Sequence, residues 1–352
     1  MKSEFSARIL ACVSGVVTGL AGFGGGASAQ VVRVEVTPPQ IDRWMYPFNQ
    51  NPGVETTIPT FGVIGIPGFD DRDSEMLVVF NTAAAGVPTG LALSQYHVGQ
   101  VRLRATVANN NVWLYEPSVK ANNDPDPKRP VELFGAGFRG PWNVFNFQNT
   151  TTFFGGACNP QPAQNCRSVF PAIFDSNGAA IDVSNQLKNN QSVQPFATGI
   201  ADGLSTGDPV PEGTTLSFEL NLCDPTVRAY VQRGFRDGRL FLLLSTLIPT
   251  SGGPGGGDGP YPRFYTRDNP LGTAPALFFD VRTGSPADVD GTGFVDSDDF
   301  VAFVNAFTRG CTGPGQSIFG VDPLCEFSAD FDGSCFTDSD DFAAFVAAFQ
   351  LG

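Results

Sequence analysis

Apolar residues between positions 30 and 284 recur in short runs or at alternating positions, a pattern typical of β-strands. The alternation is strict in 215–222, where Leu216, Phe218, Leu220 and Leu222 fall on one face. This predicts an antiparallel strand buried on one side. Six further segments are predicted as strands: Val31–Val36, Met76–Phe80, Val101–Val107, Val112–Tyr115, Leu240–Ile248 and Ala276–Val281.

One helix is predicted in this region. Asp224 and Pro225 are suited to the cap and first position of a helix, and Val227, Tyr230 and Val231 follow on one side before Gly234. The sequence contains 41 Gly and 28 Pro, which favours many turns. Short strands, frequent turns and one helix predict a mainly β fold, a jelly-roll-like β-sandwich.

The chain changes composition near Thr283–Pro286, where we place a domain boundary. Residues 285–352 contain twelve acidic residues and a single basic one, Arg309, whereas residues 30–284 contain 22 acidic and 18 basic residues. The formal charge of -14 therefore resides mostly in a small C-terminal module. The expected domains are a β-sandwich at 30–284 and this module at 285–352.

A twelve-residue acidic pattern begins at Asp288 and is repeated from Asp330. Oxygen-bearing side chains stand at positions 1, 3, 5, 9 and 12, and a backbone carbonyl at position 7 completes the oxygen ligands that Ca²⁺ prefers. Carboxylates this close repel each other unless a cation lies between them. The predicted metal ligands are Asp288, Asp290, Thr292, Phe294 by its carbonyl, Asp296 and Asp299, then Asp330, Asp332, Ser334, Phe336 by its carbonyl, Asp338 and Asp341.

The repeat continues into a predicted helix after each loop. Phe300, Phe303, Val304 and Phe307 match Phe342, Phe345, Val346 and Phe349, and each set has the spacing of one helix face. We expect the two faces to pack against each other. Position 6 is Gly293 in the first loop but Cys335 in the second, where a left-handed backbone is expected, so the second site is strained, weakened or braced by a disulfide.

A calcium loop followed by a helix, with Asp at position 12, no preceding helix and a tandem repeat, resembles a dockerin module. The resemblance covers about Ala287 to Gly352. It implies up to two calcium ions and a cohesin-like partner that contacts Ser297, Asp298, Ser339 and Asp340. Val304–Asn305 and Val346–Ala347 replace the basic and aliphatic residues that cohesin-binding dockerins commonly carry. Docking of these helices onto the protein's own β domain is therefore the alternative.

Arg263–Asp268 and Ala274–Val281 are similar to the closing strands of DNRLRE-type secreted β-sandwiches, some of which bind carbohydrate. That resemblance implies a neutral polysaccharide as a ligand class. Among the larger rings, Trp113 and Tyr115 share a strand face and are expected in the core, while Trp142 follows Gly140–Pro141 and is the candidate ligand-binding ring. Trp44 is a further available ring.

Residues 1–29 have the basic, apolar and small-residue regions of a secretory signal, so we expect an extracellular or cell-surface protein that begins at Gln30. Export makes disulfides the expected state of Cys158, Cys166, Cys223, Cys311, Cys325 and Cys335. Pairing of Cys158 with Cys166 is favoured, and Cys223 then pairs with one of the last three or stays free. No membrane span is expected.

The chain offers little for catalysis or nucleic-acid binding. Basic clusters are lacking, which argues against nucleic acid, and His97 is the single histidine. No spacing pairs the candidate acids, namely Glu55, Glu116, Glu132, Glu212 and Glu219. No catalytic residue is assigned. The leading hypothesis is a non-catalytic calcium-binding recognition or assembly protein; the alternatives are a polysaccharide hydrolase or lyase and a structural or adhesive surface protein.

Overall fold

A computed structural model describes residues 30–49, 52–63, 69–118, 129–154, 167–191, 193–250, 259–313, 316–325 and 327–351. The expected signal segment and the expected Cys158–Cys166 pair lie outside these ranges. None of the helices in the described part has the length and apolarity needed to cross a membrane.

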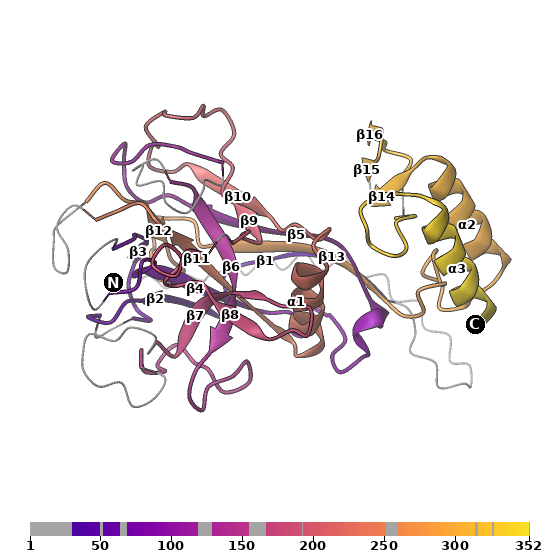
Figure 1. Ribbon diagram of the computed structural model, residues 1–352, viewed down its shortest axis with the longest axis horizontal. Coiled ribbons are helices and arrows are strands. Elements are labelled where there is room, and N and C mark those ends of the chain that lie inside the picture. The colour runs from indigo at the N-terminus through magenta and orange to yellow at the C-terminus, as the bar shows by residue number, and fades with distance from the viewer. Residues whose placement is uncertain are drawn as a thin grey trace, which may run out of the picture.

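Two antiparallel sheets form the predicted β-sandwich (Figure 1). The first has four strands, and all four were predicted from the sequence. In spatial order they are β1 (Gln30–Val36), β13 (Ala276–Thr283), β5 (Tyr96–Thr106) and β10 (Thr215–Glu219). The expected one-sided burial in β10 is confirmed at Leu216 and Phe218. The strand ends at Glu219, before the predicted end at Leu222, but Leu220 is buried and Leu222 partly buried against the same core.

The second sheet is larger and is buried on both faces in its centre. In spatial order its strands are β2 (Ile41–Met45), β4 (Glu75–Asn81), β11 (Arg239–Thr246), β6 (Val131–Phe138), β7 (Val169–Phe174) and β8 (Ala180–Asp182), with β9 (Ala197–Thr198) paired to β6. Leu242 in β11 faces the core between the sheets, and its neighbour Leu243 faces a second apolar cluster that contains Phe147. This double burial explains the uninterrupted apolar run of β11.

Smaller elements complete the β domain. Strands β3 (Thr57–Pro59) and β12 (Arg263–Tyr265) pair with each other, and a 3-10 turn, η1, spans Leu93–Gln95. The predicted strand at Val112–Tyr115 is wrong: this segment makes an isolated bridge from Leu114 to Pro209. Trp113 and Tyr115 are nevertheless buried in the main core as expected, because the surrounding turns hold them there.

The predicted helix is α1 (Pro225–Arg236), and Asp224 caps it through a hydrogen bond from the Thr226 amide. It extends two residues past the expected end at Gly234, which lies inside the helix against Leu240; the left-handed glycine that follows the helix is Gly238, with φ +78°. Val227, Val231 and Phe235 anchor α1 to the sandwich core. The helix lies at the end of the sandwich that faces the C-terminal module (Figure 1).

Residues 285–351 form two loop-helix units with their own apolar cluster. Helices α2 (Ser297–Thr308) and α3 (Ser339–Leu351) pack as predicted, and the rings of Phe303 and Phe345 stack at 4.0 Å. Between them lie β14 (Cys311–Gly313), β15 (Gln316–Ser317) and β16 (Gly320–Val321), which pair as a small sheet. A disulfide from Cys311 to Cys325 closes this connection.

A buried charge cluster near the start of β4 was not predicted. Arg167 donates to Asp70 at 3.0 Å and to Glu75, and its nearest approach to Asp73 is 3.9 Å. These four side chains are at most 4% exposed. Burial, opposed by the charge of Arg167, raises the pKa of Asp73 to about 7 and that of Glu75 to about 8. The Oδ2 of Asp73 and the Oε2 of Glu75 are buried without a hydrogen-bond partner, which is consistent with protonated acids.

These raised pKa values predict that the fold loses stability as the pH rises from about 5 to about 8. The folded protein retains protons that the unfolded chain releases near pH 4, and each retained proton lowers the unfolding free energy by up to about 1.4 kcal/mol per pH unit. The loss levels off once Asp73 and Glu75 deprotonate in the folded protein, above about pH 8. Urea denaturation across this range measures the slope. The isosteric double variant Asp73→Asn/Glu75→Gln should flatten it, and an unchanged slope in that variant would assign the pH dependence to other groups.

Candidate metal centre

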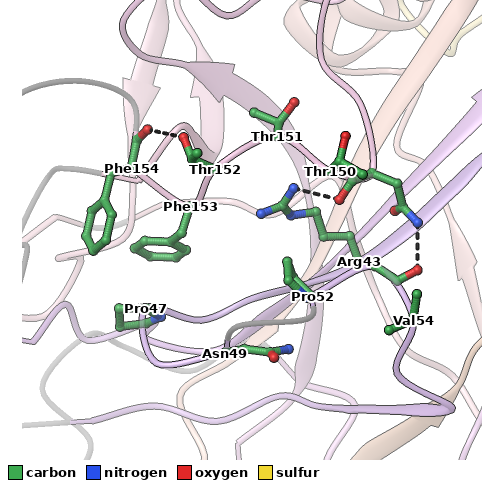
Figure 2. Close-up of a pocket in the computed structure, with 12 residues that line it drawn as sticks. Arg43, Pro47, Asn49, Pro52, Val54, Thr150, Thr151, Thr152, Phe153 and Phe154 are labelled. Atoms are coloured by element: carbon green, nitrogen blue, oxygen red, sulfur yellow. Dashed lines mark hydrogen bonds between the residues drawn. The ribbon is translucent and has the colours of Figure 1, made fainter.

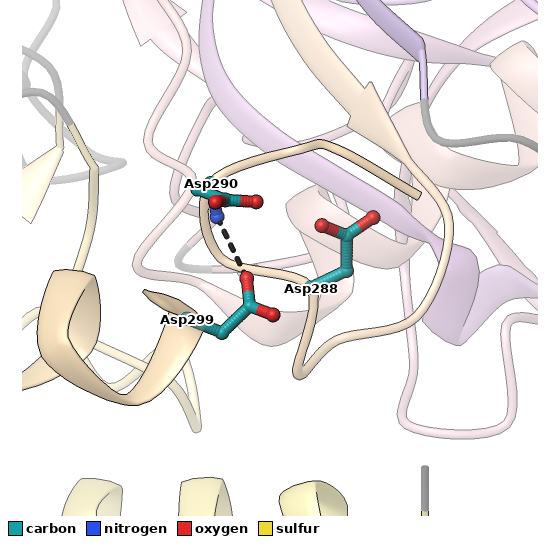
Figure 3. Close-up of side chains that lie close together, drawn as sticks. All are labelled: Asp288, Asp290 and Asp299. Carbon is teal, nitrogen blue, oxygen red and sulfur yellow. Dashed lines mark hydrogen bonds between the residues drawn. The ribbon is translucent and has the colours of Figure 1, made fainter. Parts of the chain in front are cut away.

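The first acidic loop, residues 288–299 (loop 1), follows β13 and ends in the first turn of α2. Its backbone brings Asp288, Asp290 and Asp299 together so that one carboxylate oxygen of each lies within 4.8 Å of the others (Figure 3). Asp288 and Asp299 are buried, and Asp290 is half-buried. The spacing predicted from the sequence thus produces a compact acidic site.

Backbone amides shape loop 1 by donating to the same carboxylates. Asp288 Oδ2 accepts from the Gly293 amide at 2.9 Å, and the two oxygens of Asp299 accept from the amides of Asp290 and Asp296 at 3.0 and 2.8 Å. Asp288 Oδ1 is buried and has no hydrogen-bond partner. The other oxygen of Asp288 and both oxygens of Asp299 have partners. A bound cation would supply the partner that this buried oxygen lacks.

The second acidic loop, residues 330–341 (loop 2), repeats this arrangement in detail. Asp330, Asp332 and Asp341 form the second compact cluster. Asp330 Oδ2 accepts from the Cys335 amide at 2.9 Å, and Asp341 accepts from the amides of Asp332 and Asp338 at 3.0 and 2.8 Å. Asp330 Oδ1 is again buried without a partner. The repeat in the sequence is therefore a repeat in hydrogen bonding as well.

The electrostatics of both clusters fit a cation. Burial raises the pKa of Asp288, and the neighbouring Asp299 adds to the shift. Burial raises the pKa of Asp330 to about 6, with Asp341 contributing in the same direction. A divalent ion bound by the three carboxylates of a cluster would offset the repulsion between them. Each acidic cluster can therefore hold a metal ion.

The remaining predicted ligands surround these clusters. Phe294 and Phe336 have no ligand atom in their side chains, which are 74% and 67% exposed, so their backbone carbonyls are the atoms they could offer a metal. Asp296 and Asp338 lie outside the compact clusters and accept hydrogen bonds from the amides of Asp298 and Asp340, both at 2.8 Å. Thr292 and Ser334 are exposed. The roles of these residues as ligands stay predictions.

The predicted partner positions Ser297, Asp298, Ser339 and Asp340 are all exposed in the first turns of α2 and α3. They are accessible to a partner protein. Their role in binding one stays a prediction.

Cys335 occupies position 6 of loop 2, where the sequence predicted a left-handed backbone that is strained, weakened or braced by a disulfide. Its φ is +66°, in the left-handed region that Gly293 also occupies in loop 1 with φ +90°. Its sulfur is bonded to Cys223, which directly precedes the capped start of α1. Of the alternatives, the structure shows the loop braced by a disulfide, which joins it to the β domain.

Arginines of the β domain also hold both loops. Arg228 of α1 donates to the carbonyl of Gly333 in loop 2, and Arg282 of β13 donates to the carbonyl of Asp288 in loop 1. Gly333 has a φ of +76°, which favours glycine, and a Cβ there would also displace the Arg228 guanidinium. Each acidic loop is thus in direct contact with the sandwich.

The other candidate residues have individual partners. Glu132 forms an ion pair with Arg72, Glu212 accepts from the Tyr265 hydroxyl, and Glu116 accepts from Ser118. Glu219 is exposed on β10, and Glu55 is half-buried. Burial lowers the pKa of His97 to about 4, so this histidine is neutral at physiological pH.

The larger rings are mostly buried against other side chains. Trp142 is half-buried against the second apolar cluster, so it is less exposed than its loop position suggested, because the loop folds back over the sheet. Trp44 stacks on Tyr46 at 4.8 Å and donates to Ser74. The assignment of Trp142 as a ligand-binding residue stays a prediction.

Two comparisons with known proteins place no further limits on the function. No known family matches this sequence, and the search of curated proteins found no similar chain.

Proposed function

We propose that this chain is a secreted, non-catalytic calcium-binding protein in which a β-sandwich recognition domain is joined to a calcium-stabilised module for extracellular assembly. The observation that carries the proposal is the unpartnered buried Oδ1 of Asp288 and of Asp330, each beside two further carboxylates. Two equivalent sites with the same unsatisfied atom favour a shared ligand, and a cation is the ligand that these acceptors attract.

Calcium suits these loops better than magnesium. The donors are carboxylates, hydroxyls and a backbone carbonyl on an irregular twelve-residue loop, a combination that accommodates the six to eight flexible ligands of Ca²⁺. Magnesium demands a stricter octahedral geometry and retains most of its waters. The amides that fix Asp299 and Asp341 would hold these position-12 carboxylates toward the ion.

The assembly role rests on the dockerin-like pattern and on the exposed first turns of α2 and α3. A cohesin-like partner would contact Ser297, Asp298, Ser339 and Asp340, and the sandwich would recognise a neutral polysaccharide. The disulfide and the two arginine contacts favour a second candidate, a structural protein in which the module braces its own sandwich. A polysaccharide-active enzyme is the third candidate.

Calorimetric titration of the full-length oxidised protein with Ca²⁺ should show two sites. Asp299→Asn should abolish the site in loop 1 and Asp341→Asn the site in loop 2, because each removes a buried charge from one cluster. The matched controls are Asp298→Asn and Asp340→Asn, which make the same chemical change one residue away at exposed positions. They should keep both sites.

The pattern of losses distinguishes the outcomes. Loss of one site per variant with intact controls supports calcium binding at the assigned ligands. Equal loss in a variant and its control would show that total charge matters more than these ligands. Absence of any calcium binding in the unmodified protein would contradict the proposed function.

A further inference from the structure

A cavity of about 440 Å³ opens on the side of the β domain near β2, between 47–54 and 149–154 (Figure 2). Phe153, Phe154, Pro47, Pro52 and Val54 form apolar walls, and threonines and asparagines line the rest. Arg43 is the single charged residue among the described residues of the lining. This volume lies within the usual range for small-molecule sites.

Arg43 is held rigidly with one edge of its guanidinium unused. The side chain is fully buried on the outer face of the large sheet, where its guanidinium lies 5.5 Å from the ring centre of Phe147. Its Nη1 donates to the carbonyl of Asn149 at 2.9 Å, as Figure 2 shows. Its Nε and Nη2 have no hydrogen-bond partner. These two nitrogens form the guanidinium edge that binds a carboxylate through two parallel hydrogen bonds.

The described part of the chain supplies no counter-charge for this cation. The adjacent Asp42 points to the opposite face of β2 and pairs with Arg267 at 3.3 Å. The stretches 50–51 and 155–166, which continue the sequence at the two walls, contain no acidic residue. Burial lowers the pKa of Arg43 to about 10, so the group remains a cation at neutral pH. Burying a fixed positive charge without a counter-charge costs folding free energy, unless an anion from solvent binds to it.

A second buried atom without a hydrogen-bond partner further restricts the chemistry of the ligand. Asn149 donates through Nδ2 to the carbonyl of Gly53 at 2.7 Å, which fixes the amide orientation and leaves Oδ1 buried without a partner. A Cβ on residue 53 would lie 2.5 Å from the Asn149 side chain, so glycine permits this close approach. The cavity wall thus holds a bidentate donor and a single acceptor beneath its surface, between apolar side chains. Both are closed to solvent in this conformation, so a ligand reaches them by displacing the side chains that cover them.

We propose that this cavity binds a small organic acid that presents a carboxylate to Arg43, an apolar ring to Phe153 and Phe154, and a hydroxyl to Asn149. The site is independent of the calcium loops and of the proposed assembly role, because it uses none of their residues. It gives the β domain a ligand chemistry of its own, distinct from the neutral polysaccharide expected above.

The test is calorimetric titration of the full-length protein with para-hydroxybenzoate and with para-hydroxybenzamide, which has nearly the same shape without the charge. The acid should bind at least about tenfold more tightly than the amide, since hydrogen bonds to charged groups are stronger than neutral ones. Arg43→Met, which keeps the bulk of the side chain, should lose the acid. Arg43→Lys, which keeps the charge without the parallel donors, should bind it weakly.

Glucuronate is the second acidic probe and distinguishes the source of the carboxylate. Tighter binding of glucuronate than of para-hydroxybenzoate would assign a sugar acid, and the reverse order would assign an aromatic acid. Failure of both acids to bind, equal binding of acid and amide, or unchanged acid binding in a folded Arg43→Met variant would overturn the proposal. The comparison of acid with amide uses the unmodified protein and so stands if a variant fails to fold.

Discussion

Replacing Arg167 with methionine should lower the free energy of unfolding by about 3–5 kcal/mol, the usual cost of removing one partner from a buried ionic network. Arg167 is 1% exposed and is the cation shared by Asp70 and Glu75, with Asp73 nearby. Methionine fills much of the volume but leaves these carboxylates without their positive charge. Urea denaturation at neutral pH, followed by circular dichroism, gives the loss directly.

Arg104→Met is the matched control, because it makes the same change at an ion pair on the surface. Arg104 and its partner Glu35 are 42% and 38% exposed, and a pair of this kind contributes about 1 kcal/mol or less. The difference between the two variants therefore measures the effect of burial. Similar losses in both would mean that disrupting the buried cluster costs no more than disrupting a surface ion pair, and would contradict the prediction.

How much of this fold can be predicted from the sequence depends on whether each pattern is contained in a short stretch of neighbouring residues. The strands around Leu216 and Leu242 were predictable because alternation and apolar runs are properties of neighbouring residues. The segment Val112–Tyr115 has the same alternation, but it lies among turns and never joins a sheet. Local periodicity reports which side chains are buried more reliably than it reports whether their backbone pairs.

The same reasoning separates the acidic loops from the rest of the candidate sites. Twelve consecutive residues define each loop, so spacing alone brought Asp288, Asp290 and Asp299 together. Asp70 and Arg167 are 97 positions apart, and the run of charges from Asp70 to Glu75 has the composition of a solvated turn. Its burial depends on contacts with Glu132, Arg167 and residues 184–188, which no short-range pattern contains. The unused edge of Arg43 likewise becomes visible only when all of its neighbours are placed.

Removing the Cys223–Cys335 disulfide should have an effect of similar size and should act selectively on loop 2. The two cysteines are 112 positions apart, and the chain-entropy cost that such a link removes from folding is about 4–5 kcal/mol. In the double variant Cys223→Ser/Cys335→Gly, glycine accepts the φ of +66° without strain, so the loss reports the link alone. Urea denaturation measures it, and calcium titration should show weakened binding at loop 2 with loop 1 unchanged.

A second double variant, Cys223→Ser/Cys335→Ser, separates the link from the backbone conformation. Serine at this φ costs about 1–2 kcal/mol more than glycine, so the serine form should be the less stable of the two and should bind calcium more weakly at loop 2. If instead both variants bind calcium at loop 2 as tightly as the unmodified protein, Arg228 alone holds the loop in its binding conformation. If both lose the site equally, the covalent link rather than the left-handed turn sets the position of Asp330, and the metal site of loop 2 is then a property of two domains rather than of twelve residues.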